Sequence, residues 1–483
     1  MLKTSEASLD PENWQDFRQQ GHRMLDDMLD YIEDLRERPV WQPIPAEVRA
    51  VFAAPLPKLP GDLGKAHQTF MQDVLPYAIG NSHPGFMGWV HGGGNPVGML
   101  AEMLAAGLNA NLGGREQIPV DVERQLLRWV RELFDFPESA TGLFVTGTSM
   151  ANLISVLVAR TAAQGRQVRE QGLPDGHRLT AYTSLSAHVS VAQALDMAGI
   201  GTHALRKINL NARFQMDVAD LECRIVEDKA AGMMPFMIAA TAGTVDVGAI
   251  DPLQAIADIA KREGIWFHVD GAFGALGMLA EDIAPRLSGI ERADSIAFDF
   301  HKWGQVPYDA GFVLVRDGEL HHNTFASPVA YLKRETRGMA AGSPWPCDFG
   351  PDLSRSFRAL KTWFTLQVYG SEKLGAVISN TCALAQYLRQ HVEENPKLEL
   401  LAPVALNIVC FRYRCDEADR VNADIVIALQ ESGIVAPSST TINGHFAIRA
   451  AIVNHRTQTR DIDALIEATL LFGDKITNKI NKQ

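Results

Sequence analysis

Lys302 and Asp270 each follow an apolar run, and their side chains have the chemistry of a covalent and a charged active-site group. Lys302 comes after the run 295–298 and lies next to Trp303. Apolar surroundings disfavour the ammonium form of a lysine and free its amine to attack an aldehyde. Asp270 ends the run 266–269, and a buried carboxylate is costly unless it meets a cation such as a protonated pyridine nitrogen. The pair predicts Schiff-base chemistry beside a cationic ring. A snorkelling lysine and a metal-binding or helix-capping aspartate are the structural alternatives.

An anion-binding site is predicted where a strand-like run enters a helix. Gly147, Thr148 and Ser149 come directly before the helical segment 150–160. Backbone N–H groups and small hydroxyls at a helix N-terminus bind phosphate-like anions. A simple helix cap would use the same residue types.

His188 and Thr244 follow two further strand-like segments. His188 comes after the segment 179–184 and could lie over a flat ligand, although a histidine at this position could equally be a helix cap or a buried structural residue. Thr244 follows the run 238–243.

Two other motifs offer competing functions. Residues 147–151 resemble the G-x-S-x-G motif of a serine hydrolase with Ser149 as nucleophile, and Asp270 and His455 follow in the right order. The second glycine of that motif is missing, and a hydrolase leaves Lys302 without a role. Residues 199–204 fit a dinucleotide-binding pattern but follow a helix, whereas that pattern requires a preceding strand.

The candidate residues need a sheet whose strand ends meet at one edge. Between residues 90 and 316, short apolar runs alternate with helical segments, which predicts an α/β domain with a mostly parallel sheet covered by helices. The runs are 142–146, 179–184, 236–240, 265–269, 295–298 and 312–315. Open parallel sheets bind ligands beyond the carboxyl ends of their strands, where the candidate residues lie.

The two ends of the chain are predicted to form smaller units. Apolar residues recur at helical spacing over 17–35, which indicates an amphipathic helix, and the proline-rich stretch 38–64 is expected to run extended. Residues 317–353 show little periodicity and predict a long loop, followed by helix and an αβ segment over 358–472. The predicted units are an N-terminal arm at 1–90, whose apolar face needs a partner, a large domain at 91–370 and a small C-terminal domain at 371–483.

Composition limits the partners and the compartment. The 483 residues carry a formal net charge of −12, which disfavours binding to nucleic-acid phosphates. The five cysteines are scattered and form no C-x-x-C pair, which is typical of a reducing cytoplasm. We see no signal peptide and no run of about 18 apolar residues, so we expect a soluble cytoplasmic protein without a membrane partner.

Several ordered motifs together resemble the group II pyridoxal 5′-phosphate (PLP) dependent amino-acid decarboxylases, the family of aromatic-amino-acid and glutamate decarboxylases. The motifs lie at 147–152, 187–188, 243–244, 268–272, 301–303 and 356–361. The resemblance covers almost the whole chain. It implies PLP fold type I, which is aspartate-aminotransferase-like, with PLP as cofactor, an active site at the interface of a homodimer, and decarboxylation of an L-amino acid to an amine and CO₂.

The resemblance also implies a role for each candidate residue. Lys302 would form the Schiff base with PLP, Asp270 would pair with the pyridine nitrogen and His188 would stack on the ring. Gly147, Thr148 and Ser149 would contact the phosphate, and His301 would contact the phosphate or the lysine. Thr244 and Ala272 would contact the ring, and Arg449 would lie near the substrate carboxylate.

The sequence departs from the aromatic branch of this family on the loop before Phe357. That branch has a loop tyrosine that protonates the substrate carbon after CO₂ leaves, and residues 332–356 contain no tyrosine. Either another donor such as His188 serves, or decarboxylation is coupled to oxidative deamination and gives an aldehyde.

A second departure concerns the substrate. Asp299 stands where the aromatic branch has asparagine, and the segment 88–92 replaces that branch's aromatic-proline-threonine run. The expected pocket residues Trp89, His91 and Tyr308 would admit an aromatic side chain. The basic loop residues would instead draw in an acidic one; they are Lys333, Arg334 and Arg337.

Overall fold

The computed structural model describes residues 8–327, 334–480 and 482, and a seven-stranded sheet forms its centre. The strand order is β2-β8-β7-β6-β5-β3-β4. The strands are β2 Thr141–Val145, β3 Leu179–Ser184, β4 Leu205–Ile208, β5 Met234–Thr241, β6 Trp266–Asp270, β7 Ser295–Asp299 and β8 Gly311–Val315. Each of the six predicted runs is a strand, and β4 is an additional edge strand.

The sheet is mostly parallel, as predicted. Strands β4, β3, β5, β6 and β7 run parallel to one another, and β8 lies antiparallel between β7 and β2. The parallel strands are buried on both faces, which explains why their sequences are almost continuously apolar. Their carboxyl ends therefore share one edge of the sheet.

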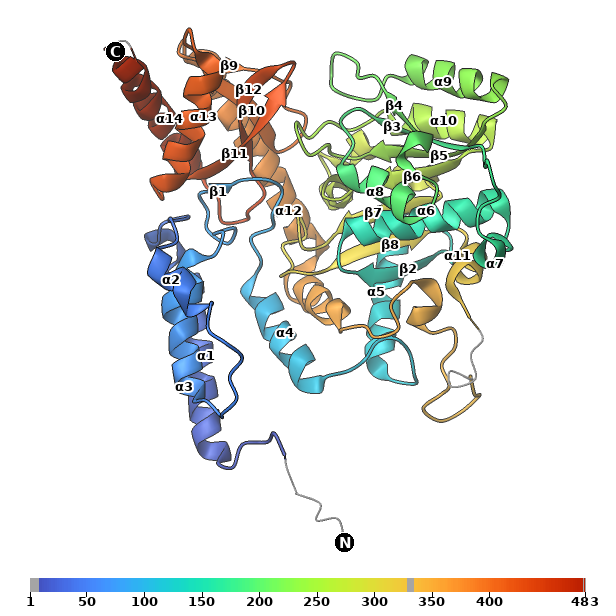
Figure 1. Cartoon of the computed structure of the whole chain (residues 1–483), viewed down its shortest axis with the longest axis horizontal. Coiled ribbons are helices and arrows are strands. Elements are labelled where there is room, and N and C mark those ends of the chain that lie inside the picture. Colours follow the sequence, from blue (N-terminus) through green and yellow to red (C-terminus); the bar gives the residue numbers. More distant parts are fainter. Residues whose placement is uncertain (1–7, 328–333, 481, 483) are drawn as a thin grey trace.

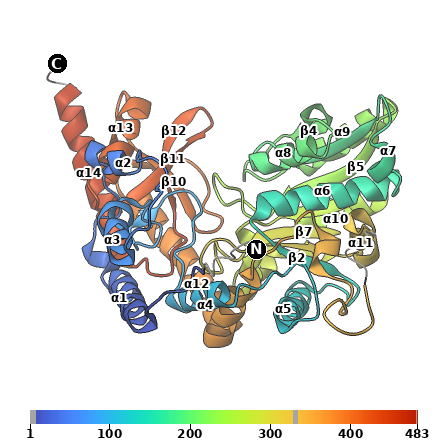
Figure 2. The ribbon, with the colours of Figure 1, turned by 60° about the horizontal axis from the view of Figure 1, so that its bottom comes forward.

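Helices cover both faces of this sheet (Figures 1 and 2). On one face lie α6 (Thr148–Gln164), α8 (Val189–Met197) and α11 (Gly318–Phe325), whose apolar residues pack against the strands. The other face packs against α5 (Ile118–Phe134), α9 (Val218–Ala230) and α10 (Leu253–Glu263). A short helix, α7 (Val168–Gln171), follows α6. The position of α6 matters for function because its N-terminus begins where β2 ends.

A second sheet of five strands lies in the C-terminal part of the chain (Figure 1). Its order is β1-β11-β12-β10-β9, formed by β1 Phe86–Met87, β9 Leu398–Leu400, β10 Ile408–Tyr413, β11 Ala436–Ile442 and β12 His445–Ala451. The long helix α12 (Arg358–Glu394) leads into it, with a non-helical residue at Gly370. Helices α13 (Ala418–Glu431) and α14 (Thr459–Ile480) pack on it, so the final αβ segment extends beyond the predicted end near residue 472. The three-part domain division stays a prediction.

The N-terminal segment forms three helices beside the second sheet (Figure 1). They are α1 (Trp14–Glu33), α2 (Ala46–Val51) and α3 (Leu63–Thr69), and α4 (Pro96–Leu108) follows β1. The amphipathic helix is confirmed, and none of the residues of α1 is buried in this single chain. The stretch 38–64 is not extended throughout, because α2 forms inside it. Pro45 caps α2, a position where the missing N–H of proline costs nothing.

The prediction of a long loop at 317–353 is partly wrong. It contains α11 and a short 3₁₀ helix, Pro346–Phe349. Lys333 lies outside the described residues. Arg334 Nη2 is 2.6 Å from Asp348 Oδ1, and its guanidinium lies over the Trp345 ring, so this residue binds within its own segment.

Candidate active site

A cavity of about 400 Å³ lies at the carboxyl ends of β6 and β7. The predicted site residues that line it are Trp89, His91, Gly147, Thr148, Ser149, His188, Asp270, Ala272, His301, Lys302 and Tyr308. They come from five separate segments of the sequence, and the shared edge of the parallel strands brings most of them together. Thr244 and Arg449 do not line this cavity.

Asp270 is the last residue of β6, and the residue is buried, with 2% of its surface exposed. Burial raises the pKa of this carboxyl, and a hydrogen bond from Asn152 together with the charge of Lys302 acts in the opposite direction. Asp270 Oδ2 accepts from Asn152 Nδ2 at 2.9 Å, and Oδ1 accepts from the Ala272 N–H at 3.2 Å. No ion pair to Asp270 forms within the described part of the chain. A cationic ring placed in the cavity would supply the missing charge.

Lys302 follows β7 by three residues, and its Nζ lies 2.9 Å from Asp299 Oδ2. The Asp299 carboxylate is buried, and its other oxygen accepts a hydrogen bond of 2.8 Å from the Thr148 N–H. One carboxylate therefore joins the candidate lysine to the N-terminus of α6. His301 Nε2 lies 3.6 Å from the same carboxylate, and burial lowers the pKa of His301 to about 4.

The N-terminus of α6 has the features of an anion site. Gly147 is its N-cap residue, and Thr148 and Ser149 form its first turn at the cavity wall. Thr148 Oγ1 is buried and has no hydrogen-bond partner among the described residues. A buried hydroxyl without a partner is unfavourable by about 1–3 kcal/mol, and a phosphate oxygen would satisfy it. These residues therefore fit the phosphate of PLP, as Asp270 fits its ring.

Aromatic side chains form another wall of the cavity. The His91 ring stacks on Trp89 at a centroid distance of 5.7 Å and meets Tyr308 edge-on at 6.0 Å. Burial lowers the pKa of His91, and the nearby charge of Lys302 lowers it further. Trp89 has a φ of +45°, a strained conformation for a large side chain. A flat apolar side chain of a ligand would fit against this wall.

The glycine run after His91 packs directly on the lysine segment. A Cβ atom on Gly92 would overlap the carbonyl oxygen of His301 and lie 2.5 Å from that of Lys302. Asn81 Nδ2 donates to the Gly92 carbonyl at 2.9 Å, which holds the run in place. Only glycine allows this close approach of the two backbones.

Thr244 and Arg449 have partners outside the cavity. Thr244 is fully buried, and its Oγ1 accepts from the Ala249 N–H at 3.0 Å. Arg449 donates to the backbone oxygens of Val245 and Trp89, and to Ser438 Oγ at 3.0 Å. Burial lowers the pKa of this guanidinium. Arg449 thus holds the backbone of Trp89 in place. It does not line the cavity, so the structure does not place it where the predicted contact with the substrate carboxylate would need it.

Sequence reasoning missed two polar residues of this region. Asn152 binds Asp270, and Ser190 lies at the cavity wall, 2.7 Å from His188 Nδ1 by its hydroxyl. Asn152 was open to prediction, because it lies four residues after Thr148 on the same helix and so on the same face. Ser190 carried no such signal.

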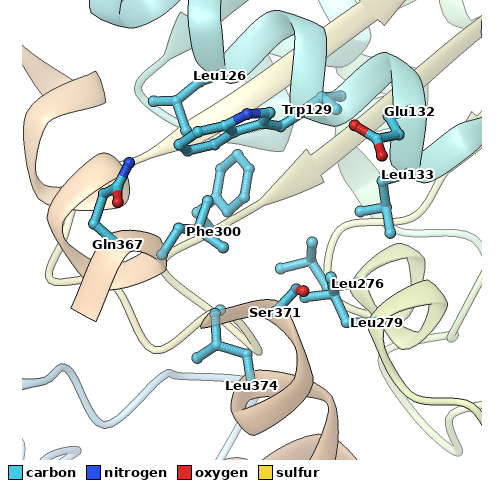
Figure 3. Close-up of a pocket in the computed structure, with 13 residues that line it drawn as sticks. Leu126, Trp129, Glu132, Leu133, Leu276, Leu279, Phe300, Gln367, Ser371 and Leu374 are labelled. Atoms are coloured by element: carbon cyan, nitrogen blue, oxygen red, sulfur yellow. The ribbon is translucent and has the colours of Figure 1, made fainter. Parts of the chain in front are cut away.

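A second cavity, of about 390 Å³, lies between α5, α12 and the 3₁₀ helix Gly274–Leu279 (Figure 3). Leucines, Trp129 and Phe300 form most of its wall, and Glu132, Gln367 and Ser371 are its polar side chains. None of its lining residues is a lysine or histidine, so it lacks the nucleophile and bases of the first cavity.

One cavity at the carboxyl edge of this sheet contains a lysine, a buried aspartate and the N-terminus of a helix. This combination defines a PLP-dependent enzyme of fold type I. Comparison with known proteins identifies the group within this class. Residues 45–414 match the family model described as the pyridoxal-dependent decarboxylase conserved domain. The chain therefore belongs to the pyridoxal-dependent decarboxylase family, and it is a PLP-dependent carboxy-lyase that decarboxylates an amino acid.

Individual relatives support this assignment. The chain is 32% identical over 461 residues to an aromatic-L-amino-acid decarboxylase of Bacillus atrophaeus, covering 93% of each. It is 27% identical to a phenylacetaldehyde synthase of Arabidopsis thaliana, covering 94% of this chain and 95% of that protein. The structure of Catharanthus roseus tryptophan decarboxylase in complex with L-tryptophan is similar with a TM-score of 0.86 at 25% identity, covering 97% of this chain and 100% of the other. The family as a whole favours simple decarboxylation over the oxidative alternative.

The serine-hydrolase interpretation is not supported. His455 Nε2 donates to the Gly94 carbonyl at 2.9 Å and does not line the cavity that contains Ser149.

None of the described helices is both long and apolar enough to cross a bilayer.

Proposed function

We propose that this enzyme decarboxylates an aromatic L-amino acid, with Lys302 as the residue that binds PLP covalently. The carrying observation is that Lys302, Asp270 and the N-terminus of α6 face one cavity. The aromatic wall of Trp89, His91 and Tyr308 and the names of the relatives support an aromatic substrate. Arg334, which a preference for acidic substrates would use, pairs with Asp348.

The residues divide the binding of PLP among them. Asp270 would keep the ring nitrogen of bound PLP charged, His188 would contact the ring, and Thr148 and Ser149 would hold the phosphate. Bound PLP supplies the electron sink that stabilises the charge left on the substrate when CO₂ departs. His301, whose Nδ1 accepts a hydrogen bond from the Ala310 N–H at 3.0 Å, keeps a neutral ring beside Lys302.

The remaining residues of the cavity determine which bond breaks. His91 and Tyr308 would hold the substrate side chain and so orient the substrate carboxylate for loss of CO₂ once PLP is bound. The close contact of Gly92 with the lysine segment excludes water from this side. With no tyrosine at 332–356, His188 is the proposed proton donor to the substrate carbon.

We further propose a cytoplasmic homodimer. Helices α1 and α4 expose large apolar side chains, among them Trp14, Phe17, Met103 and Leu108, and such a surface is typical of an interface. The five cysteines are free thiols, which is compatible with a reducing compartment.

The test uses the purified protein with added PLP. We expect a visible absorbance band that borohydride fixes, with the reduced label on the peptide that contains Lys302. Incubation with a panel of L-amino acids, scored for CO₂, amine, aldehyde and peroxide, should give CO₂ and amine with aromatic substrates. A protein that takes up no PLP would overturn the proposed function, and turnover of acidic amino acids alone would overturn the proposed substrate class.

A further inference from the structure

Asn152 lies at the centre of a buried polar network beside the cavity. Its Nδ2 group donates to Asp270 Oδ2 at 2.9 Å and to Ser190 Oγ at 3.0 Å. Its Oδ1 lies 2.9 Å from His268 Nε2. Asn152, Ser190 and His268 are 1%, 2% and 0% exposed. Both N–H groups and the oxygen of the amide are used, so the network fixes its orientation.

His268 anchors the amide oxygen of Asn152. That oxygen can only accept, so His268 Nε2 donates to it. Burial lowers the pKa of His268 to about 3, and the neutral ring must therefore accept at Nδ1. Ser295 Oγ lies 2.9 Å from that nitrogen, and Trp266 Nε1 donates to the same hydroxyl at 2.9 Å. The network is thus tied into the core strands β6 and β7.

The other arm of the network leads to His188. Ser190 Oγ accepts from Asn152, so the hydroxyl proton is available to His188 Nδ1 at 2.7 Å. The Ser190 N–H also donates to this nitrogen, at 3.2 Å. With two donors directed at Nδ1, a neutral His188 ring carries its proton on Nε2.

We propose that Asn152 is a positioning residue that serves both sides of the cofactor site: its amide stabilises the ionised form of the Asp270 carboxylate and, through Ser190, fixes His188 in the Nε2–H form. The proposal deepens the proposed function and rests on it. One residue of α6 thereby coordinates two side chains, from β6 and from the N-cap of α8, that are 82 positions apart in the sequence.

Two variants separate the arms. Asn152→Ala removes the hydrogen bonds to Asp270, Ser190 and His268. Because the bond from Asn152 opposes the effect of burial on the pKa of Asp270, its loss favours the neutral carboxyl and weakens PLP binding. A hydrogen bond to a charged group corresponds to about a 10- to 100-fold change in affinity. Ser190→Ala removes only the His188 arm, so PLP affinity should change less than about threefold.

The decisive readout is the tautomer of His188 in the protein without PLP. Protein labelled with ¹⁵N-histidine reports which ring nitrogen carries the proton, and the His188→Gln variant identifies the signal. The wild type should show Nε2–H. Both Ser190→Ala and Asn152→Ala should shift part of the population toward Nδ1–H, because the backbone N–H of residue 190 still donates to Nδ1. Visible titration with PLP gives the affinity of each variant.

Asn422→Ala is the matched control. Asn422 is equally buried and uses its amide for backbone contacts with Tyr413 and Ala418 in the second sheet region. This variant should lose stability without changing the His188 tautomer or PLP affinity. If Asn152→Ala does not fold, His268→Phe frees the Asn152 amide oxygen and should shift the same two readouts.

An unchanged His188 tautomer in both Ser190→Ala and Asn152→Ala, or unchanged PLP affinity in Asn152→Ala, would overturn the proposal. Failure of the wild type to bind PLP would instead overturn the proposed function, and the tautomer measurement distinguishes the two cases because it needs no cofactor.

Discussion

Replacing Asp299 by asparagine tests how the site is charged. The Asp299 carboxylate pairs with Lys302 Nζ at 2.9 Å and accepts the Thr148 N–H at 2.8 Å. Asparagine keeps the shape and one acceptor oxygen but removes the charge. The aromatic branch that the sequence resembles has asparagine here, so the substitution is compatible with the fold.

The substitution should have opposite effects on stability and on cofactor binding. At 2.9 Å and an effective dielectric constant of about 20, the gross attraction in the Asp299–Lys302 pair is about 6 kcal/mol. Desolvation offsets most of it, and 22% of the Lys302 side chain is exposed. We expect the protein without PLP to lose about 1–2 kcal/mol, the difference between a charged and a neutral hydrogen bond.

PLP should bind more tightly to the Asp299→Asn variant. The wild-type carboxylate places a negative charge beside the predicted phosphate site. The asparagine amide removes this charge while its oxygen still accepts the Thr148 N–H, so the substitution relieves repulsion of the phosphate. A tenfold gain in affinity, about 1.4 kcal/mol, is the expected minimum. Urea unfolding without PLP measures the first effect and visible titration with PLP the second.

Lys361→Met is a suitable control, because it breaks another ion pair of a buried side chain, with the half-exposed Glu102 at 3.1 Å, away from the Thr148 N–H. It should lower stability without tightening PLP binding. Weaker or unchanged PLP binding in Asp299→Asn, together with the expected loss of stability, would refute the reasoning that the phosphate lies next to this carboxylate.

Three further predictions follow from the geometry. Asp270→Asn removes a buried charge, so urea unfolding without PLP should show a stability that is unchanged or up to about 1 kcal/mol higher. PLP uptake should weaken. A loss of stability would contradict the inference that this carboxylate has no cationic partner until PLP binds. Gly92→Ala should abolish decarboxylation while circular dichroism stays native-like, because the new Cβ displaces the backbone of Lys302; full activity would show that the loop is not tightly packed. Stability should fall as the pH drops from about 6.5 toward 4, because histidines of the unfolded chain then bind protons and the same histidines in the folded protein stay neutral. Each such histidine contributes up to about 1.4 kcal/mol per pH unit. Burial lowers the pKa of four histidines in the folded protein to about 3 or 4; they are His268, His301, His321 and His455. Equilibrium unfolding at several pH values measures the slope, and a flat profile over this range would be inconsistent with neutral burial.

Several features of the site were predictable from the sequence. Lys302, Asp270 and the hydroxyls before α6 each follow an apolar strand, and the carboxyl ends of parallel strands share one edge, so their meeting follows from the pattern alone. The helix α11 was not predictable in the same way. Its sequence has little periodicity, and it forms because Leu320 and Phe325 pack against the cluster of β2, β7 and β8.

The surroundings of those residues required the tertiary structure. His268 and Asn152 are 116 positions apart, and only the packing of α6 on β6 brings them within 2.9 Å. The guanidinium of Arg449 donates to the backbone oxygens of Val245 and Trp89 and to Ser438 Oγ, and these partners come together only in the folded chain.

The sequence by itself determined the class of chemistry, because a lysine, an aspartate and a helix N-terminus at strand ends leave few alternatives. The tertiary structure decided how those groups are charged and oriented. Hydrogen-bond partners such as Asn152 and Asp299 act over distances of about 3 Å, and a sequence pattern specifies which face a side chain lies on but not its position to that accuracy.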